Sequence, residues 1–134
     1  MSKTLKVTIV TPDKKAVSYE AEYLKTNTNN GEIEFRYNHT PIIVGTIPAT
    51  TVIKVNDKLE YLFTSSGILY LKDNEIKICC DSCEASFEID EFRANESKQR
   101  AQKRLSDKKD IDIERAKRSL ARANARISTL KKDN

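Results

Sequence analysis

The sequence predicts an all-β domain, a sandwich or a barrel, over residues 1–86, followed by an antiparallel α-helical hairpin over residues 87–134. All three Gly, all three Pro and all five Tyr lie in the first part, whereas seven of the eight Arg lie in the second. Glycine, proline and aromatic residues suit turns and strands, and arginine, lysine and alanine suit helices. The spacing of apolar residues changes at the same place, from every second position to every third or fourth.

Length and composition exclude several classes of protein. The chain has 134 residues, 38% hydrophobic and 33% charged, which suits one compact domain with an appendage. No stretch approaches the roughly 20 apolar residues that span a bilayer, and residues 1–6 lack the apolar core of a signal peptide. We therefore expect neither an integral membrane protein nor a secreted one. The odd count of three Cys argues against a disulfide framework and indicates a reducing compartment.

Short strands joined by turns account for the first part. Apolar residues alternate over residues 5–9, 17–23 and 33–37, which predicts three strands with turns between them. Asn56 and Asp57 separate two further apolar segments, and Asp73 and Asn74 separate another two, so each pair predicts a hairpin. Many short strands at this spacing are typical of a sandwich or a barrel.

Helical periodicity begins near residue 90. Asp90 is the expected N-cap of a first helix that runs to about Leu105, and Asp112 is the expected N-cap of a second. The polar residues 106–110 would form the turn between them. The second helix carries a heptad seam, which consists of Ile113, Ala116, Leu120, Ala123, Ile127 and Leu130.

This seam is thin and rich in alanine. An isolated helix of under about 20 residues is marginal in water, so the hairpin must take stability from its partner helix, from the β domain or from another protein. A marginal element with a choice of docking surfaces is a candidate switch.

Several segments, taken in order, resemble one family. The chain opens with KVTIVTPD at residues 6–13, continues with GEI at 31–33, NHTPII at 38–43 and SSGIL at 65–69, and ends in the charged two-helix tail. This order resembles the epsilon subunit of bacterial and chloroplast F-type ATP synthases over essentially the whole chain. The strongest short match is IDEFRA at residues 89–94. It fits the family's I/L-D-x-x-R-A segment, which is linked in some bacterial members to ATP binding by the folded tail.

The resemblance implies a non-catalytic rotor subunit of the central stalk. Residues 1–86 would bind the gamma subunit and the c ring, coupling proton or sodium flow to ATP synthesis. Residues 87–134 would fold against the β domain, or extend along gamma into the alpha/beta catalytic head and block ATP hydrolysis. The subunit would be peripheral to the cytoplasmic face of the bacterial cell membrane, with the stromal side of the chloroplast thylakoid as the alternative.

The same resemblance implies a regulatory ATP site in the tail, although no cofactor is required. Arg93 and Arg100 are two helical turns apart and Arg122 and Arg126 one turn apart, so an antiparallel hairpin would bring both pairs to one surface. Forked arginine donors match the oxygens of a triphosphate, and the acceptor for the adenine amino group would be Asp90. The alternative is that these arginines are solvated or pair with a partner. The residues that correspond to the ATP-binding positions are Glu84, Ile89, Asp90, Arg93, Ala94, Arg100, Arg122 and Arg126.

Other candidate chemistry is weak. His39 has no identifiable nucleophile or base beside it, and the resemblance implies that its turn, Asn38, His39, Thr40 and Pro41, contacts the c ring. Neighbouring cysteines point to opposite faces of a strand, and no fourth ligand is evident, so we expect no metal site. The chain has no glycine-rich phosphate loop, so a bound nucleotide would not be hydrolysed.

One alternative belongs to another class. A small β domain with a basic helical arm would suit a nucleic-acid-binding protein, with steep salt dependence and aromatic stacking residues. However, the tail alternates the sign of its charges, as at residues 114–118, instead of presenting a long basic run. That pattern favours a structured hairpin, so we expect no nucleic-acid partner. No group of residues supports an enzyme.

Overall fold

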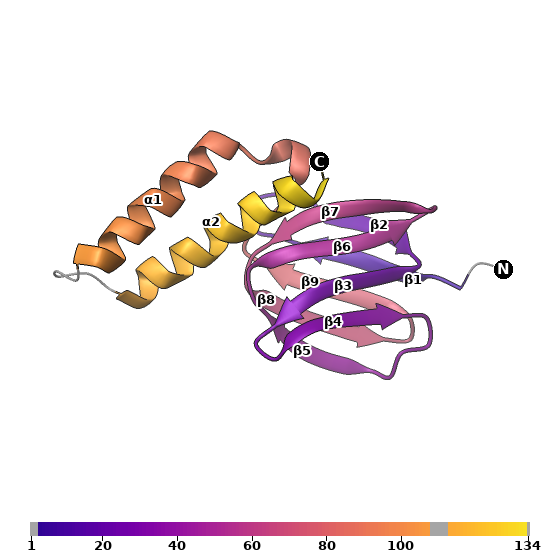
Figure 1. Ribbon diagram of the computed structural model, residues 1–134. Coiled ribbons are helices and arrows are strands. Elements are labelled where there is room, and N and C mark those ends of the chain that lie inside the picture. The colour runs from indigo at the N-terminus through magenta and orange to yellow at the C-terminus, as the bar shows by residue number, and fades with distance from the viewer. Residues whose placement is uncertain (1–2, 108–112, 134) are drawn as a thin grey trace.

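The computed structural model describes residues 3–107 and 113–133. In these residues two five-stranded sheets pack face to face, and two antiparallel helices lie beside them (Figure 1). The prediction of a sandwich or barrel followed by a helical hairpin is thus confirmed, as a sandwich. The elements are β1 (Leu5–Val10), β2 (Val17–Ala21), β3 (Tyr23–Thr28), β4 (Gly31–Arg36), β5 (Ile42–Thr46), β6 (Ala49–Val55), β7 (Lys58–Thr64), β8 (Gly67–Lys72), β9 (Glu75–Cys80), β10 (Cys83–Ala85), a 3-10 turn η1 (Ser86–Glu88), α1 (Glu91–Asp107) and α2 (Ile113–Asp133).

One sheet has the strand order β2-β1-β9-β8-β5 and the other β10-β7-β6-β3-β4. Among the strand pairs of the described residues, β1 and β9 run parallel and the others antiparallel. The alternating apolar residues meet between the sheets and exclude water, which supplies the main stabilisation of the fold. The largest buried core side chains are Leu5, Val7, Ile9, Leu24, Phe35, Ile53, Leu69, Ile76 and Ile78.

Both expected hairpins form. Asn56 and Asp57 have φ angles of 50° and 65°, and Asp73 and Asn74 have φ angles of 50° and 62°. Two consecutive residues with positive φ match the type I′ turn, whose twist suits a two-residue hairpin. Asn and Asp tolerate this conformation better than most residues, so local chemistry fixes both turns.

Three details of the strands differ from expectation. Residues 17–23 are not one strand, because the chain leaves the first sheet at Ala21 and enters the second at Tyr23. Apolar residues continue to occupy every second position through this corner, so the sequence pattern does not reveal the change of sheet. Tyr37 lies in the turn after β4 and is exposed. The sequence also gave no expectation of the edge strands β5 and β10, which are short.

The first helix begins as expected. The backbone N–H of Arg93 donates to Oδ1 of Asp90 over 3.1 Å, so Asp90 caps α1. Ala94 and Ala101 are buried on one stripe of α1, which packs mainly on α2 (Figure 1). Residues 108–110 of the expected turn and the expected cap Asp112 lie outside the described residues.

The second helix has two buried faces instead of one seam. Ala116 and Ala123 are buried on the face toward α1, while Ala125 is buried on the opposite face, toward the sandwich. Thus α2 lies between α1 and strands β6 and β7 (Figure 1). The expected seam residue Ile113 is 42% exposed, because it begins α2 at the tip of the hairpin, beyond the packed turns. At the other end Leu130 packs against the cluster formed by Phe63, Ile89 and Ala125.

Candidate functional site

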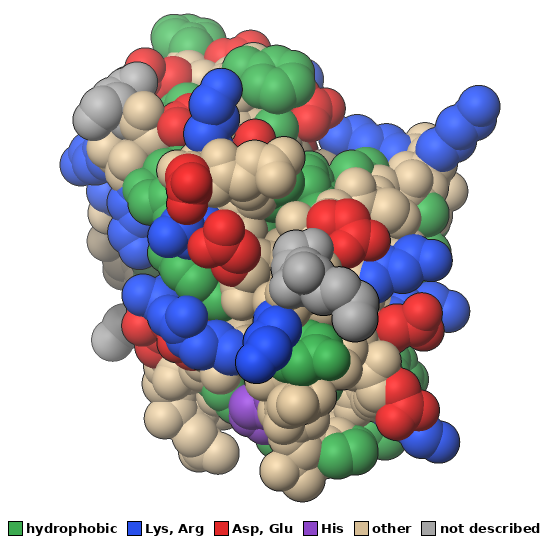
Figure 2. All heavy atoms as spheres, turned by 90° about the vertical axis from the view of Figure 1, so that its right-hand side faces the viewer, with side chains coloured by type: hydrophobic (Ala, Val, Ile, Leu, Met, Phe, Trp, Pro, Cys, Tyr) green, Lys and Arg blue, Asp and Glu red, His purple; other side chains and the backbone are tan. Residues whose placement is uncertain are grey.

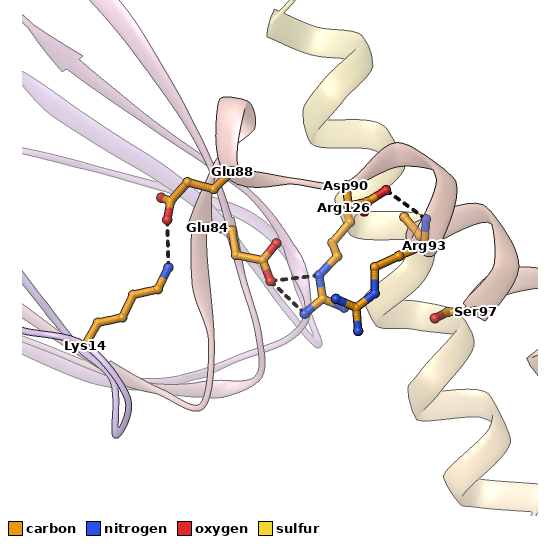
Figure 3. A pocket seen from close by; sticks show the side chains of 8 residues that line it. Lys14, Glu84, Glu88, Asp90, Arg93, Ser97 and Arg126 are labelled. Carbon is orange, nitrogen blue, oxygen red and sulfur yellow. Dashed lines mark hydrogen bonds and ion pairs between the residues drawn. The ribbon is translucent and has the colours of Figure 1, made fainter.

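A cavity of about 400 Å³ opens where the hairpin meets the sandwich. Its walls come from four parts of the chain: the loop between β1 and β2, the linker from β10 to α1, the start of α1, and α2 (Figure 3). Such a volume suits a small-molecule ligand. The lining residues are Lys14, Glu84, Glu88, Asp90, Arg93, Ala94, Ser97 and Arg126.

Arg126 reaches the cavity from α2 and is held on two sides. Its Nε and Nη2 donate to Oε1 of Glu84 over 3.1 and 3.0 Å. Its guanidinium carbon lies 4.3 Å from the centre of the Phe63 ring, in cation–π contact. Both members of the Arg126–Glu84 ion pair are about three-quarters buried. Screening by solvent is therefore weaker here than at an open surface.

Arg93 reaches the same cavity from the first turn of α1 (Figure 3). Its backbone N–H is bound to Asp90, but its guanidinium forms no hydrogen bond or ion pair with the described residues. An unpaired guanidinium that faces a cavity is a ready donor for an anionic ligand. Ala94 lines the cavity beside it, whereas Ile89 is buried behind it in the cluster with Phe63 and Ala125.

Besides Ile89, two of the four expected arginines do not line the cavity. Arg100 lies two turns further along α1, beyond Ser97, and donates to the Ser97 hydroxyl over 3.2 Å. Arg122 does not line the cavity either. The hairpin therefore brings Arg93 and Arg126 together but not all four arginines, because α1 leads away from the sandwich and the cavity closes within its first two turns.

Lys14, Glu88 and Ser97 line the cavity but were not among the residues predicted from the sequence. Helical spacing could have found Ser97, because it lies one turn after Arg93 on α1. Lys14 donates to Glu88 and to the carbonyl of Cys83, each over 3.0 Å. No local pattern links residues this far apart. The hydrogen bond with Glu88 raises the pKa of Lys14, while the Ala85 N–H and then Lys14 lower the pKa of Glu88.

The loop expected to contact the c ring lies at the end of the sandwich away from the hairpin (Figure 1). Asn38 has a φ of 65°, and its N–H donates to Oδ1 of Asn74 over 2.7 Å, which ties the loop to the turn between β8 and β9. The His39 ring packs edge-on against Phe35, and Thr40 and Pro41 are exposed.

No group of His, Cys, Asp and Glu among the described residues is arranged to hold a metal ion. Burial raises the pKa of the Cys83 thiol to about 12 and also raises that of Cys80. Neither helix of the described chain combines the length and apolar character needed to cross a membrane.

Comparison with known proteins gives a consistent result. Residues 4–86 match the family described as ATP synthase, Delta/Epsilon chain, beta-sandwich domain. Residues 88–131 match ATP synthase, Delta/Epsilon chain, long alpha-helix domain. Curated relatives named ATP synthase epsilon chain include that of Clostridium kluyveri, 43% identical over 98% of this chain and 100% of its own. Another, from Desulfitobacterium hafniense, is 36% identical over 96% of this chain and 97% of its own.

Solved structures share the fold at low sequence identity. A chain in the cryo-EM structure of the Euglena gracilis mitochondrial ATP synthase, OSCP/F1/c-ring, aligns with a TM-score of 0.80. That match covers 97% of this chain and 83% of the other, at 14% identity. A chain from the central stalk and c ring of the Tetrahymena thermophila enzyme gives a TM-score of 0.60, also at 14% identity, over 96% of this chain and 97% of its own.

Proposed function

The chain belongs to the ATP synthase delta/epsilon family as an epsilon chain, a non-catalytic subunit, and we propose that it works in the rotor of the enzyme. In this role it binds the gamma subunit, the c ring and the alpha/beta catalytic head, and couples ion flow to ATP synthesis. The same fold occurs in an ATP synthase F1/c-ring assembly and in a central stalk with its c ring, which supports this assignment. The bacterial relatives favour the cytoplasmic face of a bacterial membrane.

The outer face of the first sheet supports the binding of partners. Ile43 is 71% exposed, and its cross-strand partner Tyr70 and the nearby Ile68 are also exposed. Alternation along β5 and β8 places all three on one face. Exposed apolar residues gathered in this way mark a protein interface. Ile43 follows Pro41 by two residues, so this apolar row begins beside the loop of residues 38–41 that is proposed to contact the c ring.

We further propose that the cavity is a regulatory ATP site and that ATP holds the hairpin docked. The observation that carries this proposal is the convergence of Arg93 and Arg126 from two helices on one cavity, with the guanidinium of Arg93 unpaired among the described residues. Arg126 contributes further donors, and Asp90 retains a carboxylate oxygen for the adenine amino group. The proposed site therefore contains two arginines, whereas the sequence led us to expect four on one surface.

A ligand in this cavity touches the sandwich, the linker and both helices at once. These parts converge only while the hairpin is docked, so the ligand binds the docked state better than an extended one. A ligand shifts a conformational equilibrium only through such a difference in affinity. A tenfold difference is worth about 1.4 kcal/mol, which is enough to change the dominant state if the two are nearly balanced. ATP would thereby relieve inhibition of ATP hydrolysis by the extended tail.

Calorimetric titration of the protein with ATP tests the site. We expect saturable one-to-one binding by the natural chain, lost in Arg93→Ala and in Arg126→Ala. Arg104→Ala on α1 and Arg118→Ala on α2 are matched controls, because both side chains are exposed and neither lines the cavity. No binding at millimolar ATP, or equal losses in the controls, would remove the ATP site while leaving the rotor assignment in place.

Nothing in the site favours the nucleic-acid alternative. The cavity lining balances three cations with three carboxylates. The end of the sandwich that faces the viewer in Figure 2 carries Asp and Glu as well as Lys and Arg, whereas binding to a nucleic-acid backbone needs a basic stripe.

A further inference from the structure

Three side chains form a row across the outer face of the second sheet. Phe63 on β7 lies opposite Thr50 on β6 and opposite Glu84 on β10. Directly paired residues of adjacent strands project from the same face of a sheet. Phe63 is fully buried there, beneath α2 in the cluster with Ile89 and Ala125, which is separate from the core between the sheets.

One turn of α2 rests on this row. The Thr50 hydroxyl lies 2.8 Å from that of Thr129, the Phe63 ring lies beneath the guanidinium of Arg126, and Glu84 accepts two hydrogen bonds from the same guanidinium. Arg126 is therefore held in two ways: its guanidinium lies over the Phe63 ring, and the Glu84 carboxylate accepts two of its hydrogen bonds.

We propose that Phe63 is a positioning residue for the pocket, acting through Arg126. A guanidinium has five N–H donors, and Glu84 takes one from Nε and one from Nη2. The ring keeps the remaining three available to the cavity that Arg126 lines. A long arginine side chain loses considerable freedom when it binds a ligand, and fixing it beforehand avoids that cost.

The effect of Phe63 on ligand binding rests on the proposed ATP site. The contact between Phe63 and Arg126 does not, because it joins two side chains of the protein itself. A lysine at position 126 would keep the charge yet lose both the planar contact with the ring and the two-donor contact with Glu84. If Phe63 acts through Arg126, replacing Phe63 matters only while an arginine is present. A merely structural role would make no such distinction.

The first measurement needs no nucleotide. A proton above an aromatic face is shifted upfield, so the Nε–H of Arg126 should show a shifted NMR signal that exchanges slowly with water. Phe63→Leu and Phe63→Met, whose side chain is longer and unbranched, should both abolish the shift. Two variants are used in case one of them fails to fold. Phe35→Leu is the matched control, because Phe35 is equally buried but packs in the core between the sheets. An unchanged signal in both Phe63 variants would overturn the inference.

The second measurement is ATP affinity in a double-mutant cycle. We expect Phe63→Leu to weaken binding about fivefold, Phe35→Leu to leave it unchanged, and Phe63→Leu to have no further effect on Arg126→Lys. The inference would be overturned if Phe63→Leu and Phe35→Leu weakened ATP binding equally. It would also be overturned if Phe63→Leu weakened ATP binding as much in the Arg126→Lys variant as in the natural chain. If the natural chain binds no ATP, the proposed site fails by itself, and the NMR experiment still decides whether Phe63 positions Arg126.

Discussion

Lys14 and Glu88 tie together two segments 74 residues apart, with Nζ of Lys14 3.0 Å from Oε2 of Glu88. The same ammonium donates to the carbonyl of Cys83, and the other Glu88 oxygen accepts the N–H of Ala85 over 3.0 Å. The linker between sandwich and hairpin is thus held to the loop between β1 and β2, two residues before the N-cap of α1. Lys14, which lies outside both helices, therefore helps to determine where the helical hairpin begins.

Replacing Lys14 should loosen the linker and weaken the site. We expect Lys14→Met to reduce ATP affinity about threefold and to accelerate hydrogen exchange at the Ala85 amide by a similar factor. The effect is small because the Lys14–Glu88 ion pair is roughly half exposed. Calorimetry and exchange measured by NMR would show it. Lys15→Met, an exposed neighbour, is the control, and equal behaviour of the two variants would contradict the prediction.

Stability should depend on the ionisation of Glu88. Its folded pKa lies below the ordinary value of 4.5, so ionised Glu88 stabilises the fold above that pH, and the contribution is lost as pH falls through the folded pKa. We expect Glu88→Gln to lose less free energy of unfolding than the natural chain between about pH 5 and about pH 3. Urea denaturation at each pH measures this. Parallel curves for the two proteins would show that Glu88 contributes nothing.

The hydroxyl pair between Thr50 and Thr129 should behave as a coupled unit. Thr129 donates its proton to the carbonyl of Ala125 over 2.8 Å, so Thr50 must donate to Thr129. Thr129→Val leaves the buried Thr50 hydroxyl without a partner, at a cost of about 1–3 kcal/mol. The double variant Thr50→Val, Thr129→Val should lose less than the two single changes together. Additive losses in chemical denaturation would rule out the coupling.

Two glycines should respond oppositely to alanine. A Cβ on Gly67 would collide with the carbonyl oxygen of Cys79 and lie 2.8 Å from Cβ of Cys80, whereas a Cβ on Gly45 would meet nothing within 4 Å. We expect Gly67→Ala to destabilise the protein by about 1–3 kcal/mol or more. Gly45→Ala should be neutral or stabilising by up to about 1 kcal/mol. Thermal unfolding compares them directly, and similar melting temperatures would refute the argument.

Local chemistry made much of the fold predictable. The Asn56-Asp57 and Asp73-Asn74 turns and the Asp90 cap each depend on a few neighbouring residues, so short sequence patterns specify them. The corner at Glu22 was missed because it changes the sheet to which the chain belongs without changing the alternation of apolar residues. The seam of α2 was only partly predicted, because a heptad pattern assumes one partner, and α2 has two.

The sequence by itself determined the two-part organisation, the two-residue turns, the cap of α1 and the presence of arginines at helical spacing. All of these follow from interactions within a few residues along the chain. Only the tertiary structure decided which arginines share a cavity, that Lys14 reaches the linker, and that Phe63 lies beneath Arg126. Those relationships depend on how distant segments pack together. Apolar periodicity indicates which face of a helix or strand is buried, but not which distant segment covers that face.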